Sequence, residues 1–236
     1  MSSQNIHLYL TSEHACGYLP GRTATNLVPD PRVSMTNTLY SQLISLGYRR
    51  SGQFTYRPHC RECSACQPCR VAVDEFSPRR TQRRCLKANS DLDITVQPAF
   101  FSTELFDLYS RYINTRHADG EMVDPTPEDY RSFLYSDWSD TWFMQMRLDD
   151  ELLSVMVFDR VEDGMSAVYS FFDPRLPTRS LGTFNVLQLI EHTRQLGLDY
   201  LYMGYMITDC DKMAYKAGFR PMQYFLDNRW VTEGPG

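Results

Sequence analysis

Residues 57–70, RPHCRECSACQPCR, place four cysteines within ten residues, and thiolates at this spacing can bind a metal ion. Two residues separate each cysteine from the next, which is the C-x-x-C spacing of a knuckle that holds one zinc ion between two thiolates. The run can supply three ligands without strain, and a distant cysteine can supply a fourth. The candidate metal ligands are Cys16, Cys60, Cys63 and Cys66.

The same cysteines have other interpretations. Four zinc ligands usually come from two separated knuckles, and a bacterial ferredoxin run ends in C-x-x-x-C-P, whereas no proline follows Cys69 here. We therefore expect zinc ahead of an iron–sulfur cluster, and the alternative is a reduced loop whose thiols pack against Tyr18 and Tyr56. The odd total of seven cysteines does not suit a secreted disulfide framework, so we expect a cytoplasmic chain.

Basic residues are concentrated around the cysteine run. Residues 49–87 contain ten Lys or Arg and three acids, so this segment carries +7, and the rest of the chain carries −12 within a total of −5. Attraction of phosphate depends on the local field rather than on the total charge. The segment therefore indicates an anionic partner, and the alternative is a basic face that contacts only solvent.

Composition and hydropathy exclude two classes of protein. With 42% apolar and 13% aromatic residues in 236, the chain has enough material for a hydrophobic core, so it is not a disordered protein. No apolar run approaches the roughly 20 residues that span a bilayer, and the N-terminus lacks the basic and apolar regions of a signal peptide. We expect no membrane partner.

The elements that must position these groups follow from hydrophobic periodicity. We predict helices over residues 34–47, 103–117, 127–134, 182–197 and 211–218, with Thr126 capping the third. Short strands are predicted at 53–58, 70–76 and 92–98 around the cysteine loop. Further strands are predicted at 141–148, 152–161, 165–173, 199–207 and 221–226.

The order of these elements predicts the fold class. A meander of three strands, a long helix, a strand, a short helix and a last strand is the order of the N-acyltransferase fold of the acetyltransferase (GNAT) type. We therefore predict an α+β protein with a GNAT-like domain, a mixed central sheet with flanking helices, at residues 101–236. A cysteine-containing α+β lobe is predicted at residues 1–100.

The loop before the long helix bears on the acyl donor. Acetyl-CoA users of this fold carry Q/R-x-x-G-x-G/A there, because small residues let backbone N–H groups approach a pyrophosphate. Here the stretch is RSLGTF, in which Arg179 and Gly182 fit but Phe184 replaces the small residue. A bulky ring at this position favours a donor other than CoA.

At this point the chain resembles a known family, the aminoacyl-tRNA–protein transferases of the N-degron pathway. The segments VYSFFDPRLPTRSLGTF and YLYMGYMITDCDKMAYKAGFRP carry the resemblance in the C-terminal half. The matching positions are Tyr169, Asp173, Pro174, Ser180, Leu181, Gly182, Tyr202, Met203, Gly204, Tyr205, Cys210, Lys212, Met213, Tyr215 and Lys216.

In the N-terminal half, CGYLPGRTATNLVPDP, the cysteine run and RHADGEM resemble the bacterial branch of that family. That branch moves leucine from leucyl-tRNA onto proteins beginning with Asp or Glu, which marks them for degradation. The arginyl-transferring relatives have C-G-Y-C followed by an adjacent cysteine pair, linked to zinc or iron–sulfur binding. Here Leu19 replaces the second cysteine and no adjacent pair exists, so their metal does not carry over.

The resemblance implies a reaction that needs no cofactor, because an aminoacyl-tRNA ester is already activated. Positioning the attacking amine against the ester should supply most of the rate. The candidates for positioning the amine are Tyr205, Asp173 and Asp209. The candidates for lining a leucyl pocket are Phe171, Met144, Met203 and Met206.

The two charged partners need basic groups. Arginine binds a carboxylate through two parallel hydrogen bonds, and Arg57 is the leading candidate for the acidic N-terminus, followed by Arg70 and Arg80. For each of these arginines the alternative is a surface salt bridge. The expected contacts to the phosphates of tRNA are Arg83, Arg84, Lys87, Lys212 and Lys216.

Two functions of other classes stay open on the sequence. One is a CoA-dependent N-acetyltransferase, which would consume acetyl-CoA and release a free thiol. The other is a zinc-knuckle RNA-binding protein without catalysis, which would lose tRNA affinity on chelation.

Overall fold

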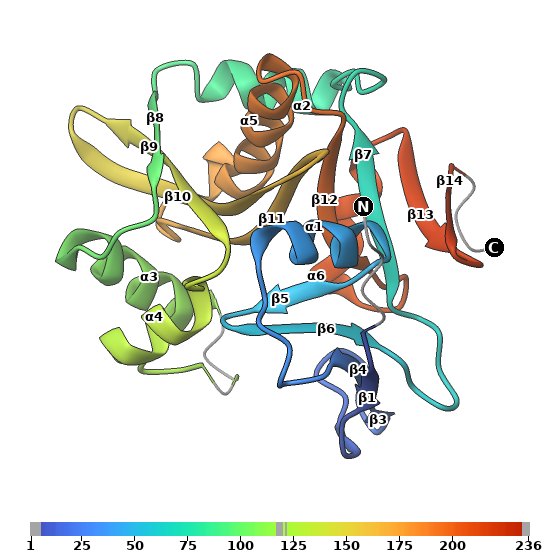
Figure 1. Ribbon diagram of the computed structural model, residues 1–236. Coiled ribbons are helices and arrows are strands. Elements are labelled where there is room, and N and C mark those ends of the chain that lie inside the picture. Colours follow the sequence, from blue (N-terminus) through green and yellow to red (C-terminus); the bar gives the residue numbers. More distant parts are fainter. Residues whose placement is uncertain (1–5, 117–119, 121, 233–236) are drawn as a thin grey trace.

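The architecture is an eight-stranded sheet with helices on both faces and a smaller sheet at one end (Figure 1). The computed structural model describes residues 6–116, 120 and 122–232, without the side chains of Asp211 and Lys212. The central sheet has the order β14-β13-β7-β12-β11-β10-β9-β8. Its strands are β7 (Gln67–Ala72), β8 (Asp93–Pro98), β9 (Asp140–Leu148), β10 (Glu151–Val161), β11 (Gly164–Phe172), β12 (Tyr200–Met206), β13 (Met222–Leu226) and β14 (Arg229–Val231).

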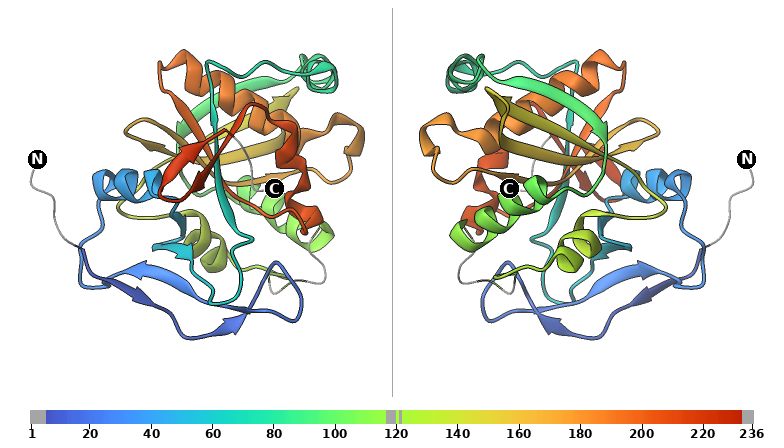
Figure 2. Two further views of the ribbon diagram at one scale, coloured as in Figure 1. Left: turned by 90° about the vertical axis from the view of Figure 1, so that its right-hand side faces the viewer. Right: turned by 90° about the vertical axis from the view of Figure 1, so that its left-hand side faces the viewer.

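The N-terminal residues form two small sheets at the lower end of the molecule (Figures 1 and 2). The four-stranded sheet has the order β1-β4-β6-β5. A separate two-stranded hairpin lies between β1 and β4 in the sequence. The strands of the four-stranded sheet are β1 (Leu8–Leu10), β4 (Asn26–Pro29), β5 (Arg49–Ser51) and β6 (Phe54–Pro58), and those of the hairpin are β2 (His14–Ala15) and β3 (Thr23–Ala24).

Two hydrophobic cores lie on opposite faces of the central sheet, because neighbouring residues of a strand point to opposite sides. On β9, Met144 packs into the core formed with α5 and α2, whereas Phe143 packs into the core formed with α3 and α4. The helices are α1 (Asn37–Ser45), α2 (Arg80–Ala88), α3 (Thr103–Arg116), α4 (Pro127–Leu134), α5 (Leu181–Gln195) and α6 (Asp211–Ala214), with 3-10 turns η1 (Pro177–Arg179) and η2 (Tyr215–Gly218).

The predicted α+β, GNAT-like fold class is confirmed. From β8 to β14 the predicted meander, long helix, strand, short helix and final strand all form. β11 and β12 are the parallel neighbours of this sheet, joined through α5. Thr126 caps α4 as expected, accepting a hydrogen bond from the Asp129 amide at 3.2 Å.

Other local predictions differ from the structure. The helix predicted over residues 34–47 is shorter, because Thr36 caps it and it ends at Ser45. The sequence does not predict α2, because the segment has few apolar residues and only Gln82 and Cys85 of its nine residues are buried. Its orientation comes from tertiary bonds instead: the Gln82 amide donates to the Gly218 carbonyl at 3.1 Å.

The predicted domain boundary at residue 100 falls between β8 and α3. β7 and β8 precede this boundary, yet both are strands of the central sheet, and β7 pairs with β12 on one side and β13 on the other. The two predicted lobes therefore share one sheet, and their division stays a prediction.

Candidate active site

The parallel strands β11 and β12 separate partway along their length. Their paired register runs from Gly164 opposite Tyr200 to Ser166 opposite Tyr202 and then stops. Beyond that point β12 bulges against β7, between Tyr202 and Gly204. Strands that part in this way leave backbone carbonyls without a partner strand, so other groups must satisfy them.

Arg49 of β5 occupies the gap between the separated strands. Its Nη2 donates to the Val168 carbonyl of β11 at 3.2 Å. Its guanidinium also lies against Gly204 of β12, whose φ of +76° and lack of a side chain make room: a Cβ at this position would be 2.6 Å from Arg49 Nη1. The guanidinium carbon is 5.8 Å from the centroid of the Tyr205 ring.

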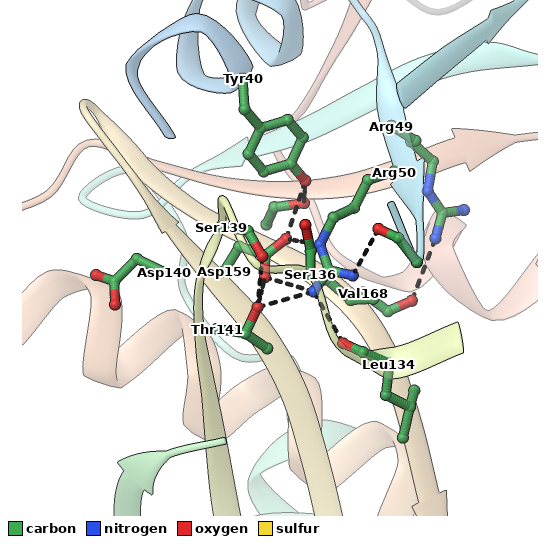
Figure 3. Close-up of polar contacts among 12 residues, drawn as sticks. Tyr40, Arg49, Arg50, Leu134, Ser136, Ser139, Asp140, Thr141, Asp159 and Val168 are labelled. Carbon is green, nitrogen blue, oxygen red and sulfur yellow. Dashed lines mark hydrogen bonds and ion pairs between the residues drawn. The ribbon is translucent and has the colours of Figure 1, made fainter. Parts of the chain in front are cut away.

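The next residue, Arg50, fixes β5 to the central sheet (Figure 3). Its Nε and Nη2 donate to the two carboxylate oxygens of Asp159 at 2.6 and 2.7 Å, and neither side chain is exposed. Tyr40 and Thr141 donate to the same carboxylate. Burial disfavours the charge on Arg50, but the carboxylate outweighs it, so the pKa of Arg50 is raised. Because alternate residues of a strand face opposite ways, this anchor turns Arg49 toward the gap.

A cavity of about 420 Å³ lies in the N-terminal lobe beside this gap. Tyr18 and Tyr56 line it, and both of these phenols also surround the guanidinium of Arg49. Tyr56 pairs with Arg49 across β5 and β6, so the two side chains share a face of that hairpin. Among the described residues, the cavity walls contain Arg22 and His14 but no Asp or Glu, which leaves the space suited to an acidic group.

The four predicted metal ligands come together at this cavity, and their role in binding a metal stays a prediction. Cys16, Cys60, Cys63 and Cys66 all line it. The Cys60 thiol donates to the Thr25 carbonyl, and the Leu19 amide donates to Cys16 Sγ. No group of three or more His, Cys, Asp or Glu among the described residues is arranged to hold a metal ion.

In this structure the thiols of the cysteine loop pack closely together. Burial, with smaller contributions from the neighbouring thiols, raises the pKa of Cys66 to about 12. At neutral pH this group is therefore a protonated, weakly reactive thiol. Cys16, Cys63 and Cys66 pack with Leu19 against Ile207 and Cys210, which follow β12. The loop thus supports the wall of the cavity next to the end of β12.

The three residues predicted to position the amine lie in different settings. Tyr205 is fully buried, and its hydroxyl donates to the Tyr56 carbonyl at 3.1 Å. Asp173 is buried and forms an ion pair of 2.5 Å with Arg175, which holds the pKa of Asp173 below its ordinary value. Asp209 is exposed in the turn after β12. The structure brings Tyr205 to the gap, and the roles of all three stay predictions.

The three arginines predicted to bind an acidic N-terminus do not gather in the gap. Arg57 faces away from Tyr56, donates to the Leu46 carbonyl at 2.8 Å and stacks over Tyr48. Arg70 is buried between the rings of Tyr200 and Trp230. Arg80 is exposed at the start of α2. Their predicted role is untested, but none of them lies between β11 and β12.

The predicted leucyl-pocket residues lie on both sides of the sheet. Met144 and Met203 are buried in the core against α5, and Met206 packs at its edge. Phe171 belongs to the core against α3 and α4. One pocket cannot be lined directly by side chains on opposite faces, so Phe171 does not join the three methionines.

The basic residues predicted to contact tRNA divide between surface and interior. Arg83, Arg84 and Lys87 are exposed on α2, and the ion pairs of the described residues include none of them. Lys216 is only 3% exposed, which argues against the predicted surface contact. The Lys212 side chain lies outside the described residues.

Lys216 instead reaches the gap from η2. Its ammonium donates to the Tyr205 carbonyl of β12 at 2.5 Å. Burial lowers the pKa of Lys216 to about 8, with the charge of Arg49 lowering it and the thiols of Cys69 and Cys210 raising it. Two cations, Arg49 and Lys216, therefore satisfy backbone carbonyls on the two separated strands.

In the sequence, Arg49 stands out only as one of the basic residues of the segment 49–87, and it is not among the predicted site residues. The available signal was the pair Arg49-Arg50 in a short strand, where one of two adjacent charges must face inward. The structure also corrects the prediction that the Phe184 ring disfavours pyrophosphate binding at the loop before α5. This ring is 2% exposed in the core beneath α5, so it does not cover the loop where a pyrophosphate would bind.

Comparison with known protein families gives two matches. The family described as arginine-tRNA-protein transferase, N terminus, matches residues 14–84, and arginine-tRNA-protein transferase, C terminus, matches residues 104–226. None of the helices in the described ranges is long and apolar enough to cross a membrane.

Individual relatives are similar over nearly the whole chain. An aspartate/glutamate leucyltransferase of Alcanivorax borkumensis is 48% identical over 228 residues, covering 97% of this chain and 94% of that protein. One of Nitrosococcus oceani is 48% identical over 227 residues, covering 96% and 95%. The crystal structure of FemX matches with a TM-score of 0.51 at 10% identity, covering 84% of this chain and 69% of that chain, which shows the fold alone.

Proposed function

This chain belongs to the arginine-tRNA-protein transferase family, and from that premise we propose that it transfers leucine from leucyl-tRNA to the α-amine of proteins that begin with Asp or Glu. The reaction forms a peptide bond and releases the 3′ hydroxyl of the tRNA. The product carries an N-terminal leucine, which would mark it for degradation. A cytoplasmic location belongs to the same proposal.

The observation that carries the proposal is the gap between β11 and β12 beside a cavity that the described residues line without an Asp or Glu. An ester carbonyl bound in the gap would lie where two strands have stopped pairing. An acceptor N-terminus entering through the cavity would approach it from the side of Tyr18 and Tyr56. Holding two reactants in such an arrangement is worth several kcal/mol of the activation barrier, about 7–11 in favourable intramolecular cases.

The chemistry asks little else of the protein. The ordinary pKa of an α-amine is about 7.7–8, so roughly a tenth or more is neutral at pH 7 and can attack the ester. The proton lost by the amine can pass to the departing oxygen or to solvent. We derive no step through a metal or other cofactor, because an aminoacyl-tRNA ester is already activated for attack by an amine.

The proposal also places the tRNA on the basic surface of α2. Cys85 donates to the carbonyls of Arg179 and Ser180, so α2 is held against the turn that begins α5. Arg79 Nη2 donates to the Ala217 carbonyl of η2, the turn that carries Lys216. Phosphate contacts from α2 would position the acceptor end without reading its sequence.

The proposal is tested by incubating the full chain with charged leucyl-tRNA and a peptide that begins with Asp, and by reading the peptide mass. A gain of one leucyl residue is the expected result, and a peptide beginning with Ala should gain none. Untouched leucyl-tRNA together with consumption of acetyl-CoA would show an N-acetyltransferase instead. Binding of tRNA without any transfer would show an RNA-binding protein.

A further inference from the structure

Arg49 is a cation at the candidate site, and no acidic group of the described residues forms an ion pair with it. Its neighbour Arg50, in contrast, is fully paired with Asp159. A guanidinium has five N–H donors, and the structure gives this one a single side-chain hydrogen bond, to Val168. A desolvated charge in this state is costly unless a ligand completes its shell.

The groups around Arg49 cannot supply the missing charge. Burial raises the pKa of Tyr18 to about 12 and holds the pKa of Tyr205 well above its ordinary value, so both are neutral phenols at neutral pH. Lys216, which reaches the gap from η2 and donates to the Tyr205 carbonyl of β12, is itself a base that becomes cationic on protonation. The neighbours of Arg49 in the described part of the chain are therefore neutral or positive.

We propose that Arg49 binds the side-chain carboxylate of the acceptor's N-terminal Asp or Glu, and thereby sets the acceptor specificity of this site. The inference rests on the proposed leucyl transfer. Arginine can grip a carboxylate through two parallel hydrogen bonds. A carboxylate bound at Arg49 would hold the adjacent α-amine close to an ester lodged between β11 and β12.

The other arginines near the site are less suited to this role. Arg50 and Arg70 are buried and committed, one to Asp159 and the other to Gln223 and two rings. Arg57 lies on the opposite face of β6 and donates to the Leu46 carbonyl. Arg49 alone of these four lies between the separated strands, and it is partly exposed, so a substrate can reach it.

The experiment compares Arg49→Met with the wild-type chain on matched peptides that differ only in their first residue, Asp or Asn. The measured quantity is the ratio of kcat/KM for the two peptides. Both values come from one preparation, so a lower folded fraction cancels. The ratio should fall at least about tenfold, since a charge-assisted contact is lost. Arg49→Lys should give an intermediate ratio, because it keeps the charge and loses the paired geometry.

Arg61→Met is the matched control, an exposed arginine of the cysteine loop, and its ratio should equal that of the wild type. An unchanged ratio in Arg49→Met, with kcat lowered equally for both peptides, would overturn the inference and assign Arg49 to the ester. The inference would also be overturned if Arg57→Met lowered the ratio of kcat/KM for the Asp and Asn peptides and Arg49→Met did not. Failure of the wild type to transfer leucine would instead refute the proposed function.

Discussion

Lys216 is a lysine held in the interior, and its titration should be visible in the stability of the protein. Its pKa is lowered to about 8 in the folded state, against an ordinary value of 10.5. Between these values the unfolded chain binds more protons than the folded chain, so this group makes the free energy of unfolding rise with pH. Cys66 and Cys69, whose pKa values are raised, act in the opposite direction in any variant that keeps them.

We therefore predict that Lys216→Met removes a pH-dependent contribution. As pH rises from 8 to 10, the free energy of unfolding of the wild type should increase relative to that of the variant. The expected increase is on the order of 2 kcal/mol. Urea denaturation at several pH values measures it. Lys87→Met, which alters an exposed lysine of α2, should give a curve parallel to that of the wild type. Parallel curves for Lys216→Met would contradict the prediction.

Gly204 is the position where backbone and guanidinium meet. Gly204→Ala combines left-handed backbone at φ +76° with a Cβ only 2.6 Å from Arg49 Nη1, so the arginine must move. We expect a loss of about 1–2 kcal/mol in stability and a fall in the preference for Asp over Asn peptides. Gly197→Ala is the matched control, with φ +67° and no heavy atom near its Cβ. It should lose similar stability and keep the preference, and equal specificity in both variants would argue against the role of Arg49.

At the scale of elements, the pair Arg50–Asp159 joins β5 to the central sheet. Both side chains are fully buried, and Arg50 also donates to the Leu134 carbonyl at 3.1 Å, which ties in the end of α4 (Figure 3). Removing one member of a buried pair leaves the other charge unpaired, which typically costs 3–5 kcal/mol. β5 has only three residues, so its position depends strongly on this network.

We predict that Asp159→Asn lowers the free energy of unfolding by about 3–5 kcal/mol. Arg50, Tyr40 and Thr141 all donate to this side chain. Asn replaces one of the two acceptor oxygens with an NH2 group, which would face these donors. The control is Asp91→Asn, which breaks the partly exposed pair with Arg179 and should cost about 1 kcal/mol or less. Urea midpoints compare them, and similar small losses in both would show that the buried pair is not the anchor.

At the scale of the whole molecule, charge is divided between a basic helix and an acidic remainder. The +7 of residues 49–87 is not all on the surface, because Arg50 and Arg70 are buried. The exposed part is carried largely by α2, where Arg83 and Arg84 have no acidic partner in the described structure. An ion-pairing role that holds two lobes together therefore has little support.

We predict that the double variant Arg83→Ala, Arg84→Ala reduces the salt slope of tRNA binding by roughly 1.4–1.8, a little under one for each phosphate contact. Its melting temperature should stay close to that of the wild type, since exposed substitutions change stability little. Filter binding across salt concentrations and a thermal melt provide the two values. A lower melting temperature with an unchanged slope would favour the ion-pairing role.

The matched control for this measurement is Arg116→Ala with Arg131→Ala, on the helices α3 and α4 that cover the other face of the sheet. The same total charge is removed there. The slope should then equal that of the wild type. Equal reductions in both double variants would mean that tRNA responds to total charge rather than to the surface of α2.

The sequence by itself determined the order of elements, the fold class and the family. Periodicity placed most helices and strands of the central sheet, and the segments around Asp173 and Tyr205 carried the resemblance. These properties can be read locally, because strand alternation, helix caps and motif spacing are set by residues near one another in the chain. α2 was missed because it has few apolar residues, and its position is fixed by contacts with α5 and Gly218.

Only the tertiary structure decided which charged groups enter the site. Arg49 and Arg57 are both arginines of short N-terminal strands, yet one lies between β11 and β12 and the other faces Tyr48. Lys216 resembled a surface cation and lies in the interior. The physical reason is that the face of a strand residue, and the depth of a charge, depend on pairing and anchors far away in sequence. Here the distant anchor is Asp159, more than a hundred residues from Arg50.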